Sequence, residues 1–185
     1  MARVTLRPLR APDVPIVRRL VQLYIYDLVG ERWGVEADGT YAPPRWHRRF
    51  WLRDGRHHFI VRVDGRPAGF ALVRELPAAA GVPTRELAEF FVLRTYRRRG
   101  VGTRVARALF ARFPGRWELS VLTWNVIARP FWRGVIRRLA VGRAVARSRR
   151  QGELTSVVWH FETAVPRRRS GGRRSRSAAA GRSSA

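Results

Sequence analysis

The chain of 185 residues contains no cysteine, which excludes disulfides, thiolate zinc sites and cysteine nucleophiles. It also lacks lysine, so its basic side chains other than histidine are all arginine. Coding composition can produce such a bias, and this weakens any inference of a nucleic-acid partner from charge alone. No run approaches the ~18 uninterrupted apolar residues that a membrane span needs. The N-terminal stretch has charges but no apolar segment after them, so a secretory signal is not indicated and we expect a cytoplasmic protein.

Acidic residues are scarce, at 13 against 38 arginines, and the formal net charge is +25. Much of the excess is local, because residues 166–185 carry arginines, serines, glycines and alanines but no acid. Such a segment cannot bury enough apolar surface to order itself. We therefore expect one domain over residues 1–165 and a disordered tail over 166–185. Nonspecific contact with polyanions at low salt follows from this charge, and RNA binding by the tail stays open as an alternative.

Histidine is also rare, and the four that occur do not suggest a metal site. His57 and His58 are adjacent in a β-rich run, so their side chains would point to opposite faces of a strand. His47 and His160 stand alone in the sequence. We expect no bound metal.

Hydrophobic periodicity and turn residues predict an alternation of strands and helices. The expected helices, apart from two in the central region, are one capped by Asp13 and ended by Gly30 and one over 45–52, within an aromatic segment that includes Trp33, Tyr41, Trp46, Phe50 and Trp51. The expected strands are 4–7, 58–63, 67–73, 87–93, 117–121, 141–146 and 154–161, with a hairpin turn at Asp64-Gly65, a break from Pro77 to Pro83 and a turn over 149–152. This mixture of hairpins and strand-helix-strand units predicts an α/β fold with a mixed sheet.

The most informative stretch is the arginine- and glycine-containing turn that follows the 87–93 strand. Gly100 and Gly102 lack a Cβ, so the backbone there can take positive φ and approach a ligand closely. The amides that open the next helix have no internal partner, and with the helix dipole they form a site suited to phosphate. Val101, Val105, Ala108 and Leu109 give that helix one apolar stripe, which ends at Pro114. A purely architectural role for the two glycines stays open at this point.

The turn reads Arg97-x-x-Gly100-x-Gly102, which resembles the acyl-CoA-binding motif of the GNAT superfamily of N-acetyltransferases. Downstream, Asn125, Ala128 and Phe131-Trp132 are similar to the pattern that follows the fifth strand in that superfamily. The resemblance covers residues 3–163 and is strongest over 87–136. It implies a mixed, mostly antiparallel sheet of about seven strands with helices on both faces, and acetyl-CoA as the acyl donor.

The resemblance also implies which residues contact acetyl-CoA. Its pyrophosphate would lie on the turn and helix start, namely Arg97, Arg98, Arg99, Gly100, Val101, Gly102 and Thr103. Its pantetheine arm would pair with the backbone of Phe91, Val92 and Leu93, and amides near Val92 and Leu93 would bind the thioester oxygen. Asn125 and Phe131 would flank the cofactor from the other side.

Acetyl transfer to an amine requires a group that removes the amine's proton, and carboxylates before the turn are candidates. Superfamily members often carry a catalytic glutamate here, which makes Glu89 and Glu86 the candidates, with Glu89 nearer the expected thioester. Strand alternation cannot decide between them, since a bulge would exchange the faces. A structural, hydrogen-bonded role for Glu89 stays open. Where many members have a tyrosine acid, this chain has Trp132, whose N–H is not a useful proton donor.

The proton for the departing thiolate would then come from water or from Tyr24, Tyr26 or Tyr96, unless none is needed. The first helix walls the acceptor site in the superfamily, so Tyr24, Tyr26 and Asp27 are acceptor-side candidates, with core or rim packing as the alternative. The acceptor expected is a primary amine of a small molecule or peptide. A CoA-binding module without turnover, a basic nucleic-acid-binding protein and a homodimer remain open.

Overall fold

The computed structural model describes residues 2–29, 34–41, 56–79 and 82–164. Its strands are β1 (Val4–Pro8), β2 (Arg56–Val63), β3 (Arg66–Ala79), β4 (Val82–Val92), β5 (Gly115–Leu122), β6 (Ala140–Gln151) and β7 (Leu154–Thr163). Its helices are α1 (Val14–Val29), α3 (Val101–Arg112) and α4 (Ala128–Leu139), with short 3-10 turns η1 (Ala11–Asp13) and η3 (Arg94–Tyr96). The expected helix over 45–52, the aromatic residues around it other than Tyr41, and the tail over 166–185 lie outside the described residues.

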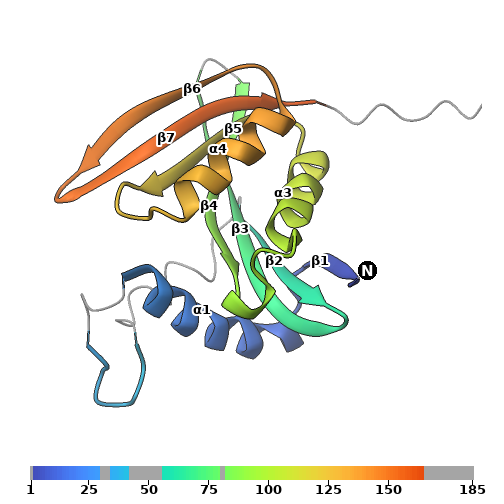
Figure 1. Cartoon of the computed structure of the whole chain (residues 1–185), viewed down its shortest axis with the longest axis vertical. Helices are drawn as coiled ribbons and strands as arrows, with labels where there is room; N and C mark the ends of the chain where they lie inside the picture. Colours follow the sequence, from blue (N-terminus) through green and yellow to red (C-terminus); the bar gives the residue numbers. More distant parts are fainter. Residues whose placement is uncertain (1, 30–33, 42–55, 80–81, 165–185) are drawn as a thin grey trace, which may run out of the picture.

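The strands form a single seven-stranded sheet in the order β1-β2-β3-β4-β5-β7-β6 (Figure 1). Every neighbouring pair is antiparallel except β4 and β5, which run parallel. Helix α3 connects those two parallel strands, as a crossover must. The predicted mixed, mostly antiparallel sheet is confirmed.

The two faces of the sheet carry separate cores, which explains the alternation along β2. Phe59 and Val61 point to the face covered by α3 and α4, where a large cluster includes Val105, Leu109 and Trp132. Ile60 points to the other face and packs with Val17, Val21 and Ile25 of α1. Helices therefore cover both faces, and the predicted layering is confirmed.

The predicted break from Pro77 to Pro83 is wrong, because β3 extends to Ala79 and β4 begins at Val82, with Leu76 opposite Thr84. Proline lacks an N–H and is normally excluded from the middle of a sheet. Here β3 pairs with β2 only as far as Arg74, and β4 pairs with β5 only from Thr84. Both prolines therefore lie where the strand has one neighbour instead of two.

Strand β6 is longer than its sequence suggested, and its turn lies elsewhere. The prediction was a strand over 141–146 and a turn over 149–152, whereas pairing continues to Gln151 opposite Leu154. Arginines at 143, 147, 149 and 150 made the strand hard to predict, because this edge of the sheet is exposed along nearly its whole length.

Asp13 was expected to cap the first helix. Its carboxylate instead accepts a hydrogen bond from Arg62 at 2.7 Å.

Candidate active site

Strand β4 pairs with its parallel neighbour along only part of its length. The register with β5 runs from Thr84 opposite Arg116 to Leu87 opposite Leu119 and ends there. Beyond that point β4 continues to Val92 beside β3, while β5 continues to Leu122 beside β7. Figure 1 shows the two strands separating as a V. The backbone of β4 that faces this opening has no strand partner there, so an extended ligand could pair with it.

A β-bulge in β4 determines which side chains face the opening. Leu72 lies opposite Glu89 whereas the next residue, Val73, lies opposite Leu87, so Ala88 is an extra residue in β4. Simple alternation would place Glu86 and Glu89 on opposite faces. The bulge instead brings both carboxylates to the face covered by α1. Both candidate bases therefore face the same layer, and the bulge by itself does not choose between them.

Glu89 is held by a tyrosine from the opposite layer. The Tyr24 hydroxyl of α1 donates a hydrogen bond of 2.5 Å to Oε2 of Glu89, and the Tyr24 ring packs edge-on against Phe70. Burial raises the pKa of Glu89 to about 7, although the hydrogen bond from Tyr24 lowers it and Glu86 raises it. Burial also raises the pKa of Tyr24 well above its usual value. A carboxylate with a pKa near 7 can accept a proton from an attacking amine at neutral pH.

The glycine turn has the backbone conformation expected of an anion site. Gly100 adopts φ 73°, in the left-handed region, and caps α3 without any side-chain hydrogen bond to the helix amides. Arg98 also has positive φ, at 62°, two residues earlier. The amides of Val101, Gly102 and Thr103 open the helix, where no intrahelical acceptor exists for them. The turn can therefore hold a phosphate group on backbone N–H groups.

Gly102 is required for a different reason, which is packing. A Cβ at this position would lie 3.1 Å from the Phe131 ring of α4 and 3.8 Å from the Phe90 ring of β4. Phe131 is itself stacked on Phe90 and lies edge-on to Trp132. The two glycines of the motif thus serve distinct purposes, one conformational and one steric.

Arg97, the first motif residue, uses its side chain within the protein. Its Nε donates to the carbonyl of Val92 at 2.7 Å, and its guanidinium pairs with the Asp27 carboxylate of α1. Arg94 pairs with the same carboxylate at 2.6 Å. Asp27 was predicted on the acceptor side. Through these two ion pairs it connects the end of α1 to the segment before the turn.

The remaining predicted residues take the following places. The amide of Leu93 donates to the Ala68 carbonyl at 2.8 Å, so it cannot also bind a thioester oxygen, and alternation directs the Val92 amide to the opening. The Asn125 side chain accepts from the Ala128 amide at 3.0 Å and caps α4. Tyr26 is 62% exposed and packs against Tyr41.

Trp132 is buried and lies edge-on to Phe90, with ring centroids 4.9 Å apart. The position where a tyrosine acid was expected is thus part of the core on the α3 and α4 face.

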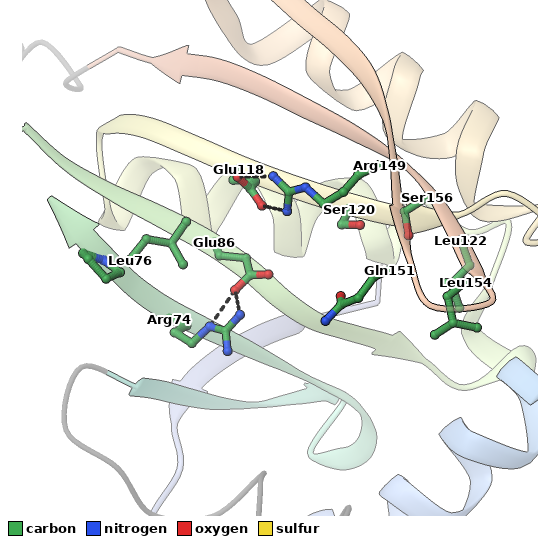
Figure 2. A pocket seen from close by; sticks show the side chains of 11 residues that line it. Arg74, Leu76, Glu86, Glu118, Ser120, Leu122, Arg149, Gln151, Leu154 and Ser156 are labelled. Carbon is green, nitrogen blue, oxygen red and sulfur yellow. Dashed lines mark hydrogen bonds and ion pairs between the residues drawn. The ribbon is translucent and has the colours of Figure 1, made fainter. Parts of the chain in front are cut away.

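A groove of about 500 Å³ continues from Glu86 across the α1 face of the sheet. Two ion pairs line it, Arg74 with Glu86 and Arg149 with Glu118, and Gln151 projects into it from the β6–β7 hairpin (Figure 2). Its other lining residues are Leu76, Pro77, Ser120, Leu122, Leu154 and Ser156. Sequence reasoning missed every one of these residues except Glu86, because they are spread over five strands. The only signal in the sequence was that polar residues alternate with apolar ones along each of these strands.

Comparison with known proteins agrees with this geometry. The sequence profile of the Acetyltransferase (GNAT) family matches residues 23–135, which include the C-terminal part of α1, the β4 opening, the glycine turn and most of α4. The chain belongs to the GNAT family of acetyltransferases. The expected family resemblance is confirmed, and curated protein sequences give no match to this chain.

Solved GNAT structures share the fold of this family member. An acetyltransferase from Thermus thermophilus is 18% identical, with a TM-score of 0.57 over 85% of this chain and 95% of the other. An aminoglycoside acetyltransferase from an uncultured soil metagenomic sample, in complex with sisomicin, is 12% identical, with a TM-score of 0.57 over 80% and 96%. The ribosomal-protein-S18-alanine N-acetyltransferase of Escherichia coli is 13% identical, with a TM-score of 0.54 over 88% and 96%.

Within the described part of this GNAT chain, no group of three or more histidine or acidic side chains is arranged to hold a metal ion. In the same residues, no helix combines the length and apolar character needed to cross a membrane.

Proposed function

We propose that this GNAT protein transfers an acetyl group from acetyl-CoA to a primary amine, in the cytoplasm, by direct attack of the amine. The observation that carries the proposal is the position of Glu89, a carboxylate with a pKa of about 7, on the strand that opens away from β5. A base that titrates near neutrality, beside a backbone free to pair with an extended ligand, suits this reaction.

Features at three places fit acetyl-CoA. The α3 N-terminus offers amides with no side-chain cap at a glycine of positive φ, which suits the pyrophosphate. The β4 backbone from Ala88 to Val92 has no β5 partner, which suits the amide groups of a pantetheine arm. Arg98 and Arg99 are exposed beside the turn and add positive charge. When bound there, acetyl-CoA would supply an acetyl group activated as a thioester.

The chain's own residues would handle the proton. Glu89 would take it from the attacking nitrogen as the C–N bond forms and the C–S bond breaks, with sulfur leaving as the thiolate. Tyr24 would hold the Glu89 carboxylate in position through its 2.5 Å hydrogen bond. The Val92 amide, directed into the opening, would stabilise negative charge on the thioester oxygen. Trp132 is assigned no proton transfer, and CoA thiolate is a tolerable leaving group.

The test has a binding part and a turnover part. The full chain is titrated with acetyl-CoA by calorimetry at physiological salt, and CoA release is then followed with a panel of primary amines. Binding together with amine-dependent release supports the proposal. Binding without release for any amine would favour a CoA-binding module, the alternative that Trp132 suggests. No binding in a folded sample would leave the glycines with an architectural role only.

A further inference from the structure

We propose that the groove on the α1 face accepts amines that also carry a carboxylate, of the kind found in an amino acid or a short peptide with a free C terminus. Its volume of about 500 Å³ suits a ligand of that size. The acceptor class rests on the proposed acetyltransferase function, because Glu89, three residues beyond the lining residue Glu86 and on the same face, is the group that would receive the amine's proton. The carboxylate would lie beside Arg149.

The charge that the groove presents to a ligand is positive. The side chains of Arg74 and Arg149 are 43% and 50% exposed, whereas those of their partners Glu86 and Glu118 are only 14% and 10% exposed. The carboxylates therefore lie beneath the guanidinium groups. A ligand entering from solvent meets guanidinium N–H groups before it meets a carboxylate.

Both guanidinium groups keep donors for a ligand. Arg149 donates from Nη1 and Nη2 to the two oxygens of Glu118, at 2.6 Å and 3.1 Å, and among the described residues its Nε has no recorded partner. Arg74 donates from Nε to Glu86 at 2.6 Å and pairs with it again through Nη2. A guanidinium has five N–H groups, so each arginine can bind a carboxylate without giving up its pair.

The charged groups of the groove and the base act on one another. Arg74 lowers the pKa of Glu89 and also that of Glu118, while Glu86 raises the pKa of Arg149. The bulge places Glu86, which lines the groove, and Glu89 on one face, so the groove and the base lie on the same side of β4. Leu122 and Leu154 line the hairpin end of the groove and could contact an aliphatic side chain.

A polycationic acceptor fits this surface poorly. Glu86 and Glu118 are each neutralised by an arginine, so a second ammonium would have to displace a guanidinium from its carboxylate. The net charge of +25 also repels cations over a longer range. A ligand with both an amine and a carboxylate avoids both costs.

The experiment compares three ligands by calorimetry on the full chain saturated with CoA at physiological salt. Glycylleucine carries the amine and the carboxylate, glycylleucinamide lacks only the carboxylate, and 1,6-diaminohexane carries two amines. Glycylleucine is expected to bind at least about tenfold more tightly than either of the others, since charge-assisted hydrogen bonds would be lost with the amide.

Variants locate the effect. Arg149→Gln is expected to remove most of the preference for glycylleucine over its amide. The double variant with Glu118→Gln and Arg149→Gln, which leaves no buried unpaired carboxylate, should do the same if the single change harms folding. Arg116→Gln is the matched control, because Arg116 pairs with Glu162 at 3.0 Å between β5 and β7 outside the groove lining. It should leave the preference unchanged.

Equal or tighter binding of the amide or the diamine would overturn the acceptor class, and so would an absence of binding by all three. A preference that survives both Arg149 variants would overturn it too. Binding is measured apart from turnover, so the two proposals can fail separately. Glycylleucine that binds by this pattern but is not acetylated would contradict the proposed activity while leaving the ligand class intact.

Discussion

The two faces of the central sheet have opposite chemistry. On the face covered by α3 and α4, Leu87 of β4 and Trp117 and Leu119 of β5 are apolar and buried. On the other face the same two strands present Glu86, Glu89 and Glu118. A single sheet thus separates an apolar core from a layer of ionisable groups only one residue away along each strand.

The comparison shows where the protein tolerates costly polar groups. The apolar face holds the packing that fixes the glycine turn, because Gly102 fits under Phe131 there. The charged face holds the candidate base and the groove, and each buried carboxylate on it has a partner, Tyr24 for Glu89 and an arginine for Glu86 and Glu118. The packing that stabilises the glycine turn and the ionisable groups of the candidate site therefore lie on opposite faces of the same strands.

The largest expected effect comes from removing the base on the charged face. Glu89→Gln keeps the shape and can still accept the Tyr24 hydrogen bond, but it cannot take a proton. We expect kcat to fall by roughly 100- to 10,000-fold, the usual range for general-base catalysis, with acetyl-CoA affinity nearly unchanged. Steady-state kinetics with calorimetry checks both values. A loss in kcat below threefold would show that another group or water is the base.

The next effect comes from overfilling the apolar face. The valine side chain of Gly102→Val would push against Phe131 and move α3 relative to α4. Because the phosphate site is the start of α3, we expect acetyl-CoA to bind roughly 10- to 100-fold more weakly, which corresponds to the usual cost of overpacking. Calorimetric titration measures this. Gly134→Ala in α4 is the control, because a Cβ there meets nothing within 4 Å. Equal affinity of the Gly102 variant and the wild type would contradict the proposed donor site.

A smaller effect on catalysis is expected from breaking the ion pairs between α1 and the segment before the glycine turn. Asp27→Asn removes the charge that pairs with Arg94 and Arg97, so the segment before the glycine turn should become less fixed. We expect KM for acetyl-CoA to rise about five- to tenfold, in line with the loss of a hydrogen-bonded charge pair, with a smaller change in kcat. Asp13→Asn, which loses the pair with Arg62 far from the turn, serves as the control.

The smallest expected effects are shifts in the pH dependence of kcat/KM, which depends on groups of the charged face. The base must be ionised to act, so kcat/KM of the wild type should rise with pH through about 7 and then level off. The Tyr24 hydrogen bond lowers the pKa of Glu89, so Tyr24→Phe should move this rise to higher pH. Glu86 raises that pKa, so Glu86→Gln should move the rise to lower pH. Shifts in the same direction for both variants would contradict the assignment of Glu89.

Local patterns in the sequence predicted much of the fold. The apolar stripe of α3 and the turn at Asp64 and Gly65, whose φ values of 48° and 80° are both positive, depend on neighbouring residues alone. The second half of β6 was missed because an exposed edge needs no apolar alternation. The prolines of the β3–β4 hairpin misled because their tolerance depends on how many strands lie beside them.

The site was harder to predict, for a related reason. Tyr24 and Glu89 are 65 residues apart, and nothing near either residue indicates their hydrogen bond. Arg74, Glu118 and Arg149 meet only because three strands distant in sequence face one groove. Motif residues such as Gly100 could be found because their backbone requirement is local. Arg97 shows the limit, because its position was predictable but its partner Asp27 was not.

The extra residue at Ala88 makes the active site depend on how β4 pairs with β3 as well as on which residues it contains. Deleting Ala88 would leave Leu87 and Glu89 in plain alternation, so Glu89 would stay on the face of α1. Regular pairing of all the residues, with no bulge, would instead turn Phe90 toward Tyr24 in place of the carboxylate. Homologous chains could therefore carry the base two or three residues after the Glu86 position and still present it to the same helix.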